Sequence, residues 1–123
     1  MRGRLEEYLQ VFDSIPEEML EQSREILYHL GILCNLTLQT EKTLQIVEKL
    51  NASLSHQRPS DRKLISWVQA LECNAYMIAH DFERTQAICD EKRPNPEDPT
   101  VEPPIHRTWH AVSGYMHFHH DQI

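Results

Sequence analysis

Residues 60–91 constrain the fold more than any other stretch, because their pattern predicts two helices joined by a very short corner. Apolar side chains recur at three- and four-residue spacing in the first half, which predicts a helix from about Asp61 to Ala79. The second helix is expected from about Asp81 to Glu91. Asp81 would cap it, since its carboxylate can accept a backbone N–H of the first turn. A pair of about 30 residues cannot bury two apolar faces alone, so neighbouring units must cover it.

The chain contains a weak internal repeat of this unit. Glu-Lys-Thr at residues 41–43 is followed by Glu-Arg-Thr at residues 83–85, and Trp67 by Trp109, each 42 residues later. The corner at residues 79–81 is similar to His-His-Asp at residues 119–121. Such a period is typical of helical solenoids. The pattern therefore predicts a repeated helix–turn–helix unit.

Further helices are expected at about residues 4–14, 23–36, 40–54 and 105–118, with Thr40 as a candidate N-cap. Gly31 falls inside one of them, and we expect it to allow close approach of a neighbouring helix. Residues 93–104 hold five of the seven prolines and are expected to be an extended linker. The prediction is an all-α fold, a tetratricopeptide-like helical-repeat solenoid of about six antiparallel helices, in one domain spanning residues 1–123. Because neither end of the array is capped, we expect a fragment of a longer multidomain protein.

Charge and composition exclude some partners. The formal net charge is -7, with 19 acidic and 12 basic residues, so the chain has no general electrostatic affinity for nucleic acid or anionic lipid. No apolar run reaches the roughly 20 residues of a membrane span, and no signal peptide is evident. We therefore expect a cytoplasmic protein. Cys34, Cys73 and Cys89 form no C-x-x-C pair. They are expected to be buried free thiols, with a disulfide or metal role as the alternative.

Several motifs resemble a known family. They are LEEYL at residues 5–9, IPEEML at 15–20, QTEKT at 39–43, AHDFERT at 79–85 and RPNPEDP at 93–99. Together they resemble the tetratricopeptide-like sensor region of MalT-type, LuxR-family bacterial transcription activators. In this chain Gln39 and His80 stand where that family usually has glycine, and Thr43 and Thr85 stand where it has alanine. The resemblance implies a superhelix that binds an inducer or a regulatory protein and controls self-association, between an ATP-binding module and a DNA-binding domain.

Polar and aromatic side chains on the longer helices are the candidate ligand or partner surface: Trp67, Asn74, Tyr76, Trp109 and Tyr115. Aromatic rings on the concave face of a solenoid could stack on a sugar or a peptide. The alternative is that these rings pack between repeats. Asn74 could bond to a ligand or face solvent.

Histidines cluster near the C-terminus and offer weak metal-ligand candidates. His106 and His110 are spaced i, i+4, a spacing that metal sites use, while His117 and His120 are spaced i, i+3. No cysteine completes a set. Structural histidines are the alternative, as is a ligand or pH-sensitive contact. We predict no metal and no cofactor.

No nucleophile, base and acid can be assembled into a recognisable set, so the chain is predicted not to be an enzyme. The expected function is effector sensing and protein interaction within a MalT-like bacterial transcription regulator, with a protein partner or a small-molecule inducer. The alternative is a free-standing tetratricopeptide-type adaptor that binds a peptide or protein. The sequence does not identify the ligand, the pathway or the oligomeric state.

Overall fold

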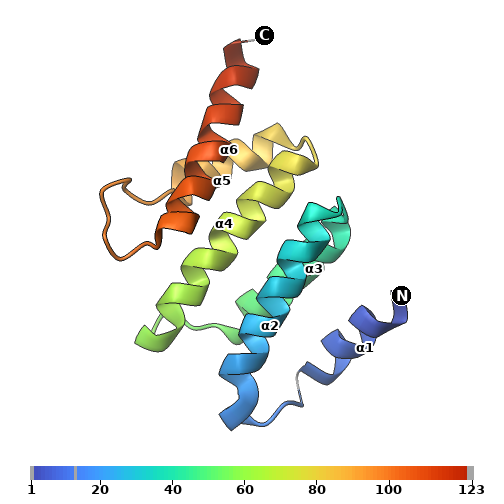
Figure 1. The fold of residues 1–123 in the computed structure, drawn as a ribbon. Coiled ribbons are helices and arrows are strands. Elements are labelled where there is room, and N and C mark those ends of the chain that lie inside the picture. The colour runs from blue at the N-terminus through green and yellow to red at the C-terminus, as the bar shows by residue number, and fades with distance from the viewer. Residues whose placement is uncertain (1, 13, 122–123) are drawn as a thin grey trace.

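The computed structural model describes residues 2–12 and 14–121, and the side chains of residues 5–12, 14–16 and 18–118. Its helices are α1 (Arg2–Phe12), α2 (Glu17–Leu36), α3 (Thr40–Ser53), α4 (Arg62–Ile78), α5 (Phe82–Lys92) and α6 (Pro103–Asp121), with a 3₁₀ turn η1 (Pro59–Asp61) before α4. The described ranges contain no strand (Figure 1). The all-α prediction with six helices is therefore confirmed.

Helices that follow one another in the chain pack together from α2 to α6, and α4 also packs against both α2 and α6. Figure 1 shows the three long helices α2, α4 and α6 running in the same general direction, while α3 and α5 return between them. The short helix α1 lies at the opposite end of the array from α6. As a result, α4 is the central helix of the array.

Two corners of the chain share one backbone geometry. Leu38, after α2, and His80, after α4, have positive φ angles of 61° and 62°. Each corner closes a Schellman motif, in which the residue after the left-handed one donates its N–H to the carbonyl five residues back. The two bonds are from the Gln39 N–H to the Cys34 carbonyl (2.8 Å) and from the Asp81 N–H to the Tyr76 carbonyl (2.9 Å).

The same correspondence extends into the helix that follows each corner. The Thr43 hydroxyl donates to the Gln39 carbonyl at 3.2 Å, and the Thr85 hydroxyl donates to the Asp81 carbonyl at 2.8 Å. Both threonines are fully buried. The resemblance set Gln39 at the family's glycine position, whereas the left-handed residue of the first corner is Leu38.

Only one of the two predicted N-caps is present. The Asp81 carboxylate accepts the Arg84 N–H at 3.2 Å, which confirms Asp81 as the cap of α5. Thr40, in contrast, is the first residue of α3, and Gln39 holds the cap position without a side-chain hydrogen bond. The Thr40 prediction is wrong because the Schellman motif ends one residue earlier than the sequence suggested.

Two predicted boundaries also differ. Helix α2 begins at Glu17 instead of Ser23, because nothing after Pro16 interrupts the helix and Ser23 lies on its buried face. Helix α6 continues through residues 119–121, so the corner expected there is absent. The proline-rich segment between α5 and α6 is a loop, as predicted, although Pro103 and Pro104 lie in the first turn of α6, where proline is tolerated.

The buried apolar side chains form two clusters. The first fills the space among α2, α3 and α4 and is centred on Leu27, Ile46 and Leu50. The second lies among α4, α5 and α6 and contains Cys73 and Trp109; Trp67 packs against both clusters. Gly31 lies against the first cluster, because an added Cβ there would lie 2.9 Å from Leu71 Cδ2 and 3.2 Å from Ile46 Cγ2. The expected close helix approach at Gly31 is confirmed.

Candidate binding groove between the long helices

A groove follows the line where α2 meets α4, and two cavities open along it. The first has a volume of about 120 Å³ and is lined by Glu21, Arg24, Glu25, Leu54, Ser60, Asp61, Lys63, Leu64 and Trp67. The second has a volume of about 130 Å³ and is lined by Tyr28, Ile32, Asn35, Leu36, Ala70, Leu71, Asn74 and Thr108. We refer to these two linings together as the α2/α4 groove. Thr108 is contributed by α6, so all three long helices take part in it.

An asparagine pair spans the second cavity. Asn35 Nδ2 donates to Asn74 Oδ1 at 2.6 Å, linking α2 to α4. Asn35 is only 5 % exposed, yet its own Oδ1 has no hydrogen-bond partner among the described residues. A buried acceptor without a donor costs about 1–3 kcal/mol. Because this oxygen is shielded from solvent, a ligand N–H reaches it only when the Asn35 side chain turns toward the cavity.

An aromatic pair separates the two cavities. The rings of Tyr28 and Trp67 have centroids 5.2 Å apart, and Lys63 Nζ lies 4.8 Å from the Trp67 ring centroid. Lys63 is also paired with Glu102 at 3.2 Å. Burial raises the pKa of the Tyr28 phenol, and the nearby Glu102 carboxylate raises it further. The Tyr28 phenol therefore stays neutral. Its ring forms a rigid apolar wall, and its hydroxyl is the polar group at the end of that wall.

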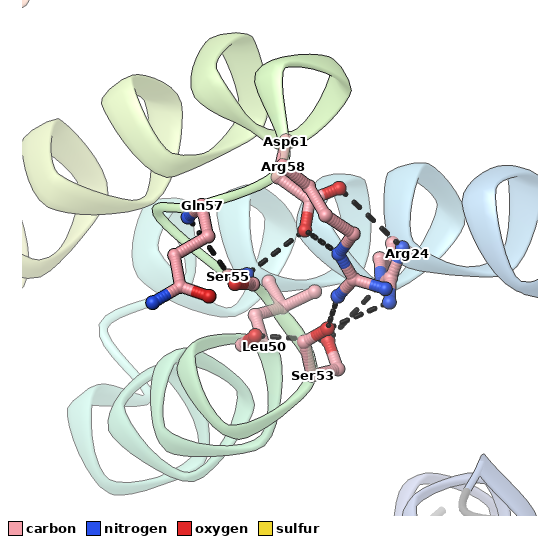
Figure 2. A network of polar contacts seen from close by, with 7 residues as sticks. All are labelled: Arg24, Leu50, Ser53, Ser55, Gln57, Arg58 and Asp61. Atoms are coloured by element: carbon pink, nitrogen blue, oxygen red, sulfur yellow. Dashed lines mark hydrogen bonds and ion pairs between the residues drawn. The ribbon is translucent and has the colours of Figure 1, made fainter.

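Figure 2 shows a buried polar network at the end of the groove where α4 begins. Asp61 accepts hydrogen bonds from the Ser55 N–H and from Arg58 Nε, both at 2.9 Å, and lies 3.8 Å from Arg24 Nη1. Arg24 in turn donates to Ser53, at 3.2 Å to the hydroxyl and 2.6 Å to the carbonyl. The network ties the end of α3 and the connector to α2.

The Arg24–Asp61 pair already has its partners inside the protein. Both residues are almost fully buried, at 6 % and 5 % exposed. Their charges are compensated by each other and by the bonds described above, so they hold the groove wall in place and are not free to bind an external ion. The exposed Glu21 and Glu25 carboxylates lie in the same cavity lining without a recorded ion pair. That end of the groove is therefore acidic.

The predicted surface residues do not form one surface. Trp67 and Asn74 both line the groove. Tyr76 lies nine residues after Trp67, about half a turn round the helix, and its ring faces Arg84, whose Cζ is 5.4 Å from the ring centroid.

The other two aromatic candidates also lie elsewhere. Trp109 is only 2 % exposed and belongs to the second core cluster, so it is a packing residue and not a ligand contact. Tyr115 stacks on Phe82, with ring centroids 5.9 Å apart. The alternative that these rings pack between helices describes Trp109 and Tyr115 better.

The histidines are spread along α6 without a common partner set. His106 Nε2 donates to the Asp98 carbonyl at 2.8 Å, while His110 and His117 are exposed. The side chain of His120 lies outside the described residues. Among the side chains that are described, no three His, Cys, Asp or Glu residues come together as metal ligands.

Sequence reasoning missed the residues that organise the groove. Arg24 and Asn35 lie on the apolar stripe of α2, three residues before and eight residues after Leu27. Both positions place a polar side chain against the core, and this placement is the signal that could have revealed them. Asp61 was recognised only as a helix start.

Comparison with protein-family models, with curated proteins and with solved structures found no match for this chain. Of the helices described within residues 2–12 and 14–121, none combines the length and the apolar character needed to cross a membrane.

Proposed function

We propose that the chain is a non-catalytic, tetratricopeptide-like interaction module whose α2/α4 groove binds a peptide segment of a partner protein. The observation that carries the proposal is the Asn35–Asn74 amide pair, which lines a largely apolar cavity and leaves the Asn35 side-chain oxygen without a donor. A side-chain amide presents an acceptor and a donor together, the same pair of groups that a peptide bond offers. Asn35 and Asn74 can thus hydrogen-bond to the main chain of an extended segment.

The repeat supports this proposal. The two corners with left-handed Leu38 and His80, and the buried threonines that follow them, favour the interpretation of α2–α3 and α4–α5 as repeats of one unit. Stacking such units aligns their longer helices along one face. We propose a solenoid arrangement on this basis, with the groove on the face that α2, α4 and α6 share.

The size of the cavities favours a peptide over an enclosed small molecule. Pockets that enclose drug-sized ligands usually measure about 300–1,000 Å³, whereas the two groove cavities measure about 120 and 130 Å³. Each is large enough for one or two side chains of a bound segment. A groove that accepts separate side chains while pairing with a main chain is a recurrent form of peptide recognition.

The charge of the groove indicates which peptides fit. Lys63 is paired with Glu102 and Arg24 with Asp61, whereas Glu21 and Glu25 leave two exposed carboxylates at one end. A segment with a basic side chain at that end and an apolar one near Asn35 would match both cavities. Binding should then weaken as salt rises, because exposed charges are screened.

A role as the effector-sensing region of a MalT-like regulator stays a proposal that rests on the sequence resemblance. The cytoplasmic location, the self-association and the non-catalytic character belong to that same set of predictions. An inducer-sensing site would require a larger enclosed pocket than the groove provides.

The test is selection of peptides from a random display library against the full chain, followed by calorimetric titration. We expect selected peptides to lose at least tenfold in affinity for the Asn74→Ala variant. The matched control is Asn51→Ala, the same chemical change at an exposed position of α3, which should leave affinity unchanged. Equal binding by both variants, or failure to select any peptide, would overturn the proposal.

A further inference from the structure

We propose that Cys89 is a site of oxidation by peroxide and that Cys73 resolves the oxidised thiol to form a disulfide between α4 and α5. The argument starts from the contact between the two thiols. Cys73 Sγ and Cys89 Sγ lie 3.6 Å apart, although the residues are 16 positions apart in sequence and belong to different helices. Both are free thiols. A disulfide requires this separation to shorten to about 2.05 Å, so the two sulfur atoms have to approach by about 1.5 Å.

The two thiols differ in access, and this difference assigns their roles. Cys73 is fully buried. Cys89 is partly exposed and lines a cavity of about 210 Å³ between α5 and α6, together with Arg93 and His117. A water-sized molecule needs only about 10–15 Å³, so hydrogen peroxide can enter. Cys89 is thus the thiol that reacts first with the oxidant, and Cys73 is the buried thiol that reacts second.

The chemistry balances with hydrogen peroxide as the oxidant. The Cys89 sulfur attacks one peroxide oxygen, the O–O bond breaks, and Cys89 sulfenic acid and water are formed. The Cys73 sulfur then attacks the Cys89 sulfur. An S–S bond forms, the S–O bond breaks, and the hydroxyl leaves with the Cys73 proton as a second water. A dithiol reductant reverses the product to the two thiols.

The environment of Cys73 sets the order and the pace of these steps. Burial raises the pKa of the Cys73 thiol, and the neighbouring Cys89 raises it further. Since the thiolate is the reactive form, Cys73 is a poor first target and a slow resolving group. The same environment disfavours a soft metal ion at this pair, because metal binding needs both thiols deprotonated and the described residues provide no third ligand.

The test uses the folded full-length chain treated with hydrogen peroxide, alkylated and digested with trypsin without reduction. Cleavage after lysine and arginine places Cys34, Cys73 and Cys89 in separate peptides, at residues 25–42, 64–84 and 85–92. We expect a cross-linked pair of the latter two, lighter by two hydrogens than their sum, while Cys34 remains alkylated. Reduction should restore both peptides.

Variants separate the two roles. With Cys73→Ser, the Cys89 sulfenic acid should persist and be trapped by a cyclic 1,3-dione, whereas Cys89→Ser should give neither a disulfide nor label at Cys73. Cys34→Ser is the control and should oxidise like the unaltered chain. A disulfide that includes Cys34, dione label at Cys73 in preference to Cys89, or cross-linking that begins only once denaturant unfolds the chain would each overturn the proposal. The peptide map of the unaltered chain shows which cysteines are cross-linked, so it tests the proposal even if a variant fails to fold.

Discussion

Leu38 and His80 hold the same left-handed backbone conformation, with φ of 61° and 62°, at the ends of α2 and α4. For a residue with a Cβ this conformation costs about 1–2 kcal/mol, and glycine is the usual residue at this point of a Schellman motif. The strain is therefore present twice, at equivalent corners. It is tolerated because the carbonyls that end both helices are satisfied by the motif.

Replacing Leu38 by glycine should stabilise the protein. Leu38 is 74 % exposed, so its side chain contributes little packing, and relief of strain should exceed the entropy cost of glycine. We expect Leu38→Gly to raise the free energy of unfolding by about 0.5–1 kcal/mol, measured by urea denaturation. Leu33→Gly is the matched control: Leu33 is 58 % exposed but lies inside the same helix, so glycine should cost about 1 kcal/mol there. A loss of stability in both variants would contradict the prediction that the positive φ of Leu38 strains the backbone.

Removing the charge of Asp61 should destabilise the protein far more than removing the side chain of Arg58, its exposed partner. Asp61→Asn keeps the shape but leaves Arg24 as a buried charge without its counterion, a change that costs about 3–5 kcal/mol. Arg58 also bonds to Asp61, but its side chain is 48 % exposed, so Arg58→Ala should cost about 1 kcal/mol or less. Thermal and urea unfolding would measure both. Adding Arg24→Met to Asp61→Asn should recover part of the loss; no recovery would mean that the two residues act independently.

Gly31 in α2 and Gly114 in α6 should respond in opposite ways to replacement by alanine. An added Cβ at Gly31 would press on Leu71 and Ile46, whereas nothing lies within 4 Å of the corresponding position at Gly114. Gly114→Ala should stabilise α6 by about 0.5–1 kcal/mol. Gly31→Ala gains the same propensity but overpacks the core at a cost of about 1–3 kcal/mol. Chemical denaturation of both variants should therefore separate them by about 1–3 kcal/mol; equal values would show that the core relaxes freely.

Replacing Asn35 by leucine should separate stability from binding. The change removes a buried carbonyl that has no donor, and the half-exposed Asn74 can exchange its lost bond for water. We expect the free energy of unfolding to change by about 1 kcal/mol or less, while affinity for a selected peptide falls to background. Circular dichroism and titration on the same sample provide both readings. Full binding by a folded Asn35→Leu variant would exclude Asn35 from the recognition surface.

The helices and their capped corner were predictable because they depend on local sequence. Periodic apolar residues predicted helix α4, and Asp81 was predicted to cap α5. Gly31 indicated a close contact with a neighbouring helix. Each of these features is present in the structure. The site was less predictable because it depends on which helix lies opposite. Trp67 and Trp109 are equivalent by spacing, yet one lines the groove and the other, on α6, is buried in the second core cluster. Arg24 and Asp61 are 37 positions apart, and neither shows its partner until α2 and α4 are side by side.

The position of Trp67 against both core clusters has a consequence for cooperativity. Every recorded packing between helices joins elements that are adjacent or next but one in the described chain, so contacts are local and rapid folding is favoured. The indole of Trp67 contacts both clusters, so a change to that one side chain reaches both parts of the core at once.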